Sequence, residues 1–211
     1  MLINRYEIAG RMPTFKPNLR DLVRRGLKTK TLRVMNPQPE GAFQGPELYH
    51  PCAVDRYGDL VPGKEIFGIY GDEWGLRCPH GRPGDIRVLR EPLYKSPESH
   101  VAYYDDLRIF YPAVDWKWRS NTLSSMFMPT KYGRTLVEYL SITGVRLHDI
   151  TTEGAIAEGI PNRISIDQYN NYGTGSVHVD AFAGLWDKIN GKTYPWSGNW
   201  WVWDIKWKLI C

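Results

Sequence analysis

Basic side chains concentrate between positions 11 and 33. Eight Lys and Arg residues lie there against a single acidic residue, Asp21, although the formal net charge of the whole chain is only +4. They are Arg11, Lys16, Arg20, Arg24, Arg25, Lys28, Lys30 and Arg33. Clustered cationic side chains attract phosphates and other anions. The segment therefore predicts an anion or nucleic-acid site, and the alternative is a solvated helix face followed by a charged strand.

A mirrored pair of short motifs is the second candidate for chemistry. His50-Pro51-Cys52 and Cys78-Pro79-His80 carry two imidazoles and two thiols, the donor set of a tetrahedral zinc site. One residue separates the donors in each motif, whereas zinc motifs usually have about two to four. We therefore expect turn residues around a partly buried Cys, with zinc as the alternative, and no other cofactor.

Aromatic residues are frequent and offer surfaces for base stacking, since Phe, Trp and Tyr make up 13% of the chain. Near the C-terminus, Trp201, Trp203, Ile205, Trp207 and Leu209 follow strand spacing, so we expect this stripe to pack in the core. Better stacking candidates are the aromatic residues in predicted loops, namely Trp116, Trp118, Tyr169 and Tyr172.

Short elements must position these side chains. Residues 17–26 predict a helix with Asn18 as its cap and Gly26 as its stop. Residues 28–35 predict a strand that places Thr29, Thr31 and Arg33 on one face. Further strands are expected at 66–70, 86–91, 101–105, 135–147 and 200–210, and helices at about 151–159 and 182–189.

The composition predicts one folded domain. The chain has 211 residues, enough for a sizeable core, with 15 Pro and 20 Gly that favour many turns. It contains no internal repeat and no break in composition. We expect a single α+β domain dominated by a β-sheet or small barrel, with long loop insertions near 36–63 and 161–178.

No apolar run approaches the roughly 20 residues of a membrane span. The first residues contain no apolar stretch typical of a signal peptide. Three widely spaced Cys argue against a secreted disulfide framework. We therefore expect a cytoplasmic protein with no membrane partner.

Residues 26–33 read G-x-K-T-x-T-x-R and resemble the signature of the ASCH (activating signal cointegrator homology) family. Further segments, in the same order, are similar to the bacteriophage and prophage branch of that family: 78–91, 128–134, 148–160, 182–191 and 201–205. The resemblance implies a single PUA-like β-barrel with flanking helices. Residues 36–63 and 161–178 match no segment of the family pattern, and His80 stands where the family has Tyr.

Characterised members of this family either bind RNA or hydrolyse the amide of N4-acetylcytidine. The resemblance to the hydrolase implies that Lys28, Thr31 and Glu158 are catalytic. A threonine hydroxyl needs a base to take its proton, and a lysine can do so only when its pKa is lowered, as neighbouring Lys30 and Arg33 would lower it. Glu158 would protonate the leaving nitrogen or orient the lysine. In an ideal strand Lys28 and Thr31 point to opposite faces, so they converge only if the chain still turns after residue 26.

These observations predict a phage-type ASCH protein that binds a nucleobase, nucleotide, modified nucleoside or RNA in a cationic cleft between the first helix and the barrel. DNA is a further candidate, and a phage-encoded protein would act in the host cytoplasm. Expected ligand-binding residues are Arg25, Thr29, Lys30, Arg33, Arg90, Tyr169 and Tyr172, with a structural ion pair as the alternative for Arg90. The two other function classes are an amidohydrolase that removes an acyl group from a modified nucleoside and a non-catalytic phage interaction protein.

Overall fold

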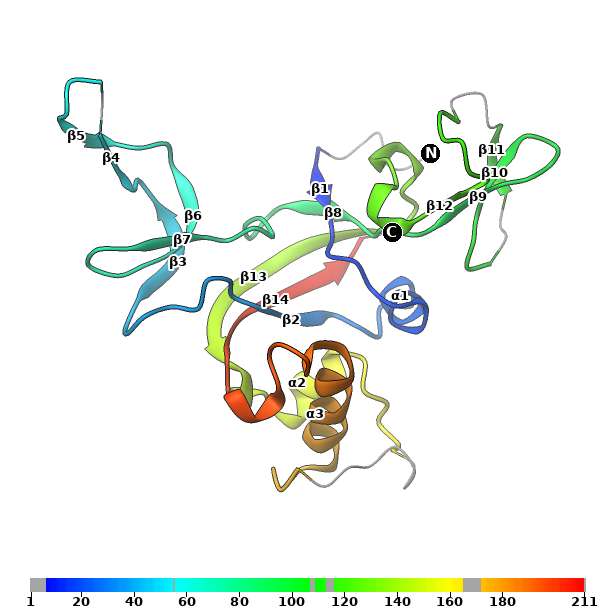
Figure 1. The fold of residues 1–211 in the computed structure, drawn as a ribbon. Helices are drawn as coiled ribbons and strands as arrows, with labels where there is room; N and C mark the ends of the chain where they lie inside the picture. Colours follow the sequence, from blue (N-terminus) through cyan, green and yellow to red (C-terminus); the bar gives the residue numbers. More distant parts are fainter. Residues whose placement is uncertain (1–6, 55, 107–108, 113–115, 165–171, 211) are drawn as a thin grey trace. The chain divides into compact units, whose positions relative to one another are not determined.

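The computed structural model describes residues 7–54, 56–106, 109–112, 116–164 and 172–210 (Figure 1). The chain divides into two compact units, each assembled from separate stretches of sequence. Unit 1 comprises Met1–Leu27, Gly84–Glu138 and Lys208–Cys211, and unit 2 comprises Lys28–Pro83 and Tyr139–Trp207.

Unit 1 contains one α-helix and several short strands. In chain order these are β1 (Ile8–Arg11), α1 (Pro17–Arg24), β8 (Ile86–Val88), β9 (Leu93–Lys95), β10 (His100–Tyr103), β11 (Ile109–Pro112), β12 (Thr122–Leu123) and the 3₁₀ helices η3 (Ser125–Phe127) and η4 (Thr130–Tyr132). Strand β1 pairs in parallel with β8, and β8 pairs with the first residues of β13 (Leu136–Arg146). A second sheet has the order β11-β10-β9-β12.

Helix α1 forms where the sequence predicts it. Pro17 occupies the first turn, where its missing N–H is not needed, and Leu19 and Val23 are buried. Gly26 adopts a left-handed φ of 68° just beyond the helix, which favours glycine. The expected cap at Asn18 is wrong, because the N-cap residue is Lys16 and no side chain caps this end.

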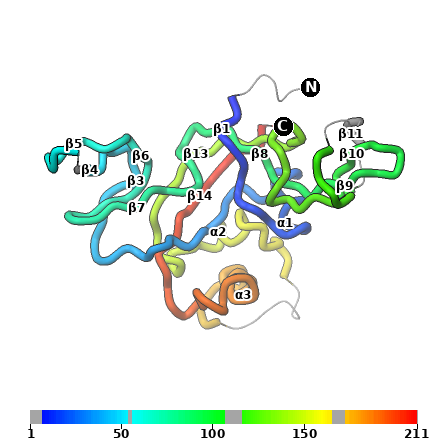
Figure 2. Tube along the Cα trace, turned by 45° about the horizontal axis from the view of Figure 1, so that its top comes forward, coloured from blue at the N-terminus to red at the C-terminus, as the bar shows by residue number. Residues whose placement is uncertain are grey.

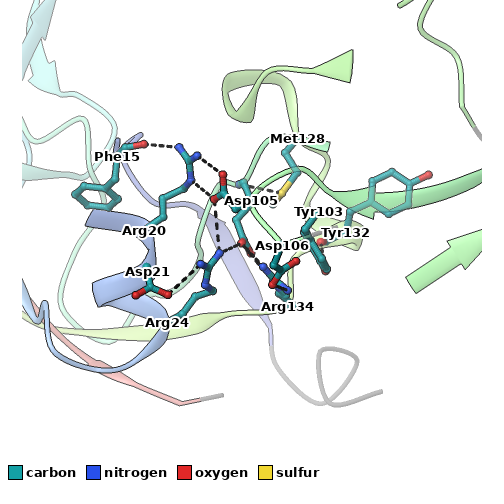
Figure 3. A network of polar contacts seen from close by, with 11 residues as sticks. Phe15, Arg20, Asp21, Arg24, Tyr103, Asp105, Asp106, Met128, Tyr132 and Arg134 are labelled. Atoms are coloured by element: carbon teal, nitrogen blue, oxygen red, sulfur yellow. Dashed lines mark hydrogen bonds and ion pairs between the residues drawn. The ribbon is translucent and has the colours of Figure 1, made fainter. Parts of the chain in front are cut away.

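A network of ion pairs joins arginines and carboxylates in unit 1, among them Arg20, Arg24, Asp105 and Arg134 (Figure 3). Glu91 has no exposed surface, and its Oε1 accepts hydrogen bonds from Arg24 of α1 at 2.6 Å and from Arg134 at 2.8 Å. Nearby, Arg20 donates two hydrogen bonds to Asp105, at 2.7 and 2.8 Å. Burial acts to lower the pKa of Arg134, but its hydrogen bonds to Glu91 and Asp106 raise it overall. These charge-assisted bonds fasten α1 to Glu91 and Asp105, in connecting segments that follow it by more than sixty residues.

Unit 2 holds most of the sheet. Its elements are β2 (Lys30–Val34), β3 (Gln44–Tyr49), β4 (Cys52–Val54), β5 (Leu60–Pro62), β6 (Ile66–Tyr70), β7 (Gly75–Arg77), most of β13, η5 (Leu147–Asp149), α2 (Thr152–Ala157), α3 (Val177–Asn190), η7 (Trp196–Gly198) and most of β14 (Trp201–Leu209). The strands run in the orders β13-β14-β2 and β3-β6-β7, and β4 pairs with β5.

Helices α2 and α3 pack against each other on one side of the β13-β14-β2 sheet (Figures 1 and 2). Thr151 caps α2 by accepting a hydrogen bond from the Gly154 N–H, and Gly159 follows the helix with a φ of 101°. The core between helices and sheet includes side chains from β2, α2, α3 and β14, among them Leu32, Ala155, Phe182, Trp186 and Val202. This core holds the end of α2 against β2.

The structure confirms the α+β class and most predicted elements, including the strands at 66–70 and 135–147 and the three helices. Of the predicted C-terminal core stripe, Trp203, Ile205 and Trp207 are buried, whereas Trp201 is partly exposed and Leu209 is exposed, because these two lie at the ends of β14. The expectation that 36–63 is a loop is wrong, since it contains β3, β4 and β5. None of the described sheets closes into a barrel. Within the described ranges, no helix has the length and apolar character needed to cross a bilayer.

The Glu91 network generates a stability prediction for unit 1. Replacing the buried Glu91 with Gln leaves the partly buried Arg24 and Arg134 without their shared carboxylate, so we expect a loss of up to about 3–5 kcal/mol. Asp21→Asn removes a carboxylate that is nearly half exposed and should change stability little. Urea unfolding followed by circular dichroism measures both variants, and equal stabilities would contradict the assigned role of Glu91.

Candidate functional site

Strand β2 is the last strand in its sheet order, so one side of its backbone has no neighbouring strand in the described sheet. The N–H of Leu32 on that side donates to the Glu158 carboxylate. The C=O of Lys30 accepts a hydrogen bond from the Lys28 ammonium at 2.7 Å. Two side chains thus provide the hydrogen bonds that a further strand would otherwise make.

Lys28 is almost completely enclosed, with a relative exposure of 1%. Its Nζ donates to the C=O of Lys30 and to the C=O of Glu158, both at 2.7 Å, and to the Glu158 carboxylate. An ammonium group has three N–H donors, and these three acceptors account for all of them. Lys28 therefore holds parts of the chain together rather than presenting its charge to solvent.

Glu158 follows α2 directly and brings the end of that helix to β2. Its backbone N–H donates to the Gly154 C=O at 3.0 Å, and its carboxylate accepts from Lys28 and Leu32. Next to it, the Thr29 N–H donates to the Ala157 C=O at 3.0 Å. Residues separated by more than 120 positions therefore meet at one point, as the resemblance implies for Lys28 and Glu158.

The relative orientation of Lys28 and Thr31 follows from where β2 begins. The strand starts at Lys30, so strand alternation does not extend back to Lys28. Thr31 pairs with Ile205 of β14, and the Lys28 ammonium lies 5.9 Å from the ring centroid of Trp207, two residues along the same face of β14. Lys28 and Thr31 therefore lie toward the same face of this sheet.

Burial and charge act together on the basic residues of this face. Burial lowers the pKa of the Lys28 ammonium, the Glu158 carboxylate opposes this shift, and Arg33 and Lys30 add to it. Loss of water contact also lowers the pKa of Arg33, again opposed by Glu158. Arg33 pairs with Trp203 in register with Thr31 and Ile205, so its side chain points to the face of Lys28 and Thr31. Unlike those two residues, Arg33 is partly exposed.

Lys30 points to the other face of β2, where α2 and α3 lie. Its Nζ donates to Asp204 Oδ2 at 2.8 Å, and both residues are buried, with relative exposures of 8% and 5%. Lys30 is thus an ion-pair partner inside unit 2. The sequence pattern missed Asp204, because alternation in the last strand places it on the polar face; a lone acid between Trp203 and Ile205 was the available signal.

The remaining predicted ligand-binding residues lie elsewhere. Arg25 and Arg90 belong to unit 1, where Arg25 pairs with Asp21 at 3.4 Å and Arg90 Nε donates to the Met12 C=O at 2.6 Å. The Tyr172 hydroxyl donates to Asp187 at 3.1 Å in unit 2. Tyr169 lies outside the described residues. Two further stacking candidates, Trp116 and Trp118, pack against the core of unit 1.

The four zinc candidates do not form a metal site in the part of the chain that the structure describes. No group of three or more His, Cys, Asp and Glu side chains is arranged there to hold a metal ion. His50 contacts the Gly63 C=O through Nδ1 at 3.0 Å, and Cys52 is exposed whereas Cys78 is buried. His80 is partly exposed. The expected turn around a partly buried Cys is wrong for the first motif, because Cys52 is exposed and begins strand β4, and the Gly63 N–H donates to the Pro51 C=O next to the β4–β5 pair. In the second motif, Pro79 and His80 lie in a turn that follows the buried Cys78.

The Lys28–Glu158 pair predicts strong energetic coupling. Lys28→Met and Glu158→Gln each leave a buried charge without its partner, so each should destabilise the protein by about 3–5 kcal/mol. The double variant removes both charges and should lose clearly less than the sum. Urea unfolding of the four proteins measures the coupling, with the exposed Lys208–Glu138 pair as a control expected to couple by less than about 1 kcal/mol. Additive losses at positions 28 and 158 would contradict the pairing.

Comparison with known proteins gives no match. No protein-family model matches the chain, and neither curated proteins nor solved structures match it. The likeness to the ASCH family therefore rests on the motif residues of the sequence.

Proposed function

We propose that this chain is an ASCH-type, PUA-like protein that binds a nucleobase or nucleotide, free or within RNA, beside residues 28–33. The observation that carries the proposal is the buried contact between Lys28 and Glu158, the pair that the motif resemblance implies. Buried ionisable groups are costly, and they concentrate at functional sites. A structural ion pair needs only one lysine and one carboxylate, whereas Arg33 adds a second cation on the face of Lys28 and Thr31.

The residues of this site divide into supporting and contacting groups. Lys28 and Glu158 use their hydrogen bonds within the protein, so they support the strand and set its conformation. Arg33 is the partly exposed cation on the same face as Thr31. A guanidinium donates paired hydrogen bonds to phosphate oxygens or to the acceptor edge of a base. Arg33 is therefore the residue that we expect to contact the ligand directly.

Titration calorimetry with cytidine, cytidine monophosphate and a short single-stranded RNA tests this function. Arg33→Gln removes a charge-assisted contact and should weaken binding about tenfold or more. The affinity for the nucleotide and the RNA should fall as salt rises, and the affinity for uncharged cytidine should not.

Lys206→Gln is the matched control. It removes a positive charge from the neighbouring strand β14, but its exposed side chain lies on the opposite face from Arg33. Its affinities should equal those of the unmodified protein. Absence of binding across the panel, or equal weakening by both variants, would reject the proposal.

A second candidate function is hydrolysis of an acylated base, and the lowered pKa of Lys28 favours it. A neutral Lys28 amine could take the proton of the Thr31 hydroxyl as its oxygen attacks the acyl carbon. The C–N bond then breaks, the exocyclic nitrogen takes up a proton, and water later hydrolyses the threonine ester. A neutral amine keeps two N–H donors, so Lys28 would retain two of its three contacts while acting as a base.

Incubation with N4-acetylcytidine, followed by chromatography for cytidine and acetate, tests this candidate. Thr31→Val and Lys28→Met should each reduce turnover at least about 100-fold, because each removes a reacting group. The rate should rise with pH through the Lys28 pKa, which burial places below that of an exposed lysine. No turnover by the unmodified protein, or full turnover by Thr31→Val, would exclude it.

A further inference from the structure

We infer that Asp204 is a positioning residue for the Lys28–Glu158 pair and acts through Lys30 from the opposite face of β2. The inference rests on the proposed function, since it concerns the same site. Asp204 lies outside the G-x-K-T-x-T-x-R motif of residues 26–33, and it touches neither Lys28 nor Glu158 in the described contacts. Its route to them is a short chain of hydrogen bonds through one residue of the strand.

Lys30 contacts Asp204 through its side chain and Lys28 through its backbone. Its ammonium donates to Asp204 Oδ2 at 2.8 Å, and its backbone C=O accepts from Lys28 Nζ at 2.7 Å. The side chain is thereby held on the face toward α2 and α3 while the carbonyl is held at the strand edge. Because both groups belong to one residue, the Asp204 contact restricts how the Lys30 peptide can rotate and so where Lys28 is anchored.

The cross-strand register brings Asp204 close to the second anchor as well. Asp204 pairs with Leu32, and the Leu32 N–H is the backbone group that donates to Glu158. The neighbouring pair is Lys206 with Lys30. The Lys30 C=O and the Leu32 N–H, which bind Lys28 and Glu158, therefore both belong to the part of β2 that pairs with Asp204 and Lys206 of β14.

Burying the Asp204 carboxylate costs free energy, which indicates a role for its negative charge beyond packing. Asp204 Oδ1 is buried and makes no hydrogen bond within the described part of the chain. A carboxylate with an unsatisfied oxygen costs free energy that a well-packed apolar pair at positions 30 and 204 would avoid. The negative charge of Asp204 compensates the Lys30 ammonium, which otherwise disfavours the ammonium form of Lys28.

The charged groups around Lys28 define what the loss of Asp204 should do. Glu158 at the end of α2 stabilises the Lys28 ammonium, and Arg33 and Lys30 of β2 disfavour it. On β14, Asp204 compensates Lys30, with the exposed Lys206 3.9 Å from Asp204; on β13, Tyr139 interacts with Arg33. Without Asp204, Lys30 remains an uncompensated cation, so Lys28 should lose its proton at a lower pH.

Nitrogen-15 NMR of the lysine side chains tests the inference without any ligand. Lys28→Arg identifies the Lys28 signal by its absence, and a pH titration then follows that signal in the unmodified protein and in Asp204→Asn. The Lys28 titration should move to lower pH in Asp204→Asn and stay unchanged in Lys206→Gln. An unchanged titration in Asp204→Asn overturns the inference.

A double-mutant cycle with Lys30→Met tests whether Asp204 acts on Lys28 through Lys30 or through its negative charge alone. In the Lys30→Met background, Asp204→Asn should no longer move the Lys28 titration to lower pH. The same shift in both backgrounds overturns the inference. If Asp204→Asn fails to fold, Lys30→Met alone decides, since its Lys28 titration should move to higher pH. The proposed function is judged separately by cytidine and nucleotide binding, so either can fail without the other.

Discussion

The structure of unit 2 depends on one carboxylate at the edge of a sheet. A strand edge leaves N–H and C=O groups that need partners, and a buried carboxylate needs donors. Glu158 and Lys28 satisfy both requirements together, because Glu158 accepts the Leu32 N–H while Lys28 donates to the Lys30 C=O and to Glu158. Neither side chain could be buried there without the other. The end of α2 is thereby fixed to β2, with Thr31 and Arg33 on a defined face.

Unit 1 also contains a buried carboxylate, which is paired with arginine rather than lysine. Glu91 is fully buried between Arg24 and Arg134. A guanidinium stays protonated in proteins and matches carboxylate geometry with two parallel donors, so that network is suited to holding structure. An ammonium can lose its proton when burial disfavours its charge. The two buried clusters therefore differ in chemical capacity, because only the one at Lys28 contains a fully buried ammonium whose pKa burial lowers.

Long, regularly patterned elements were predictable from sequence, and short irregular strands were not. The eleven-residue strand β13 and helix α3 bury side chains at their characteristic spacing. Strands β3 to β5 escaped prediction because they have only three to six residues, and because β3 contains Gly45 and Pro46, β5 ends at Pro62, and both expose most of their side chains.

The sequence by itself determined the α+β class, the core stripe of Trp203, Ile205 and Trp207, and the identity of Lys28, Thr31 and Glu158 as candidates through their motif. Those properties follow from local spacing and residue type. Only the tertiary structure decided that Lys28 and Glu158 touch, that Lys30 turns away to Asp204, and that Arg33 keeps partial access to solvent. Contacts of this kind join residues more than 120 positions apart, and they depend on where β2 begins and where α2 ends, which no local pattern specifies.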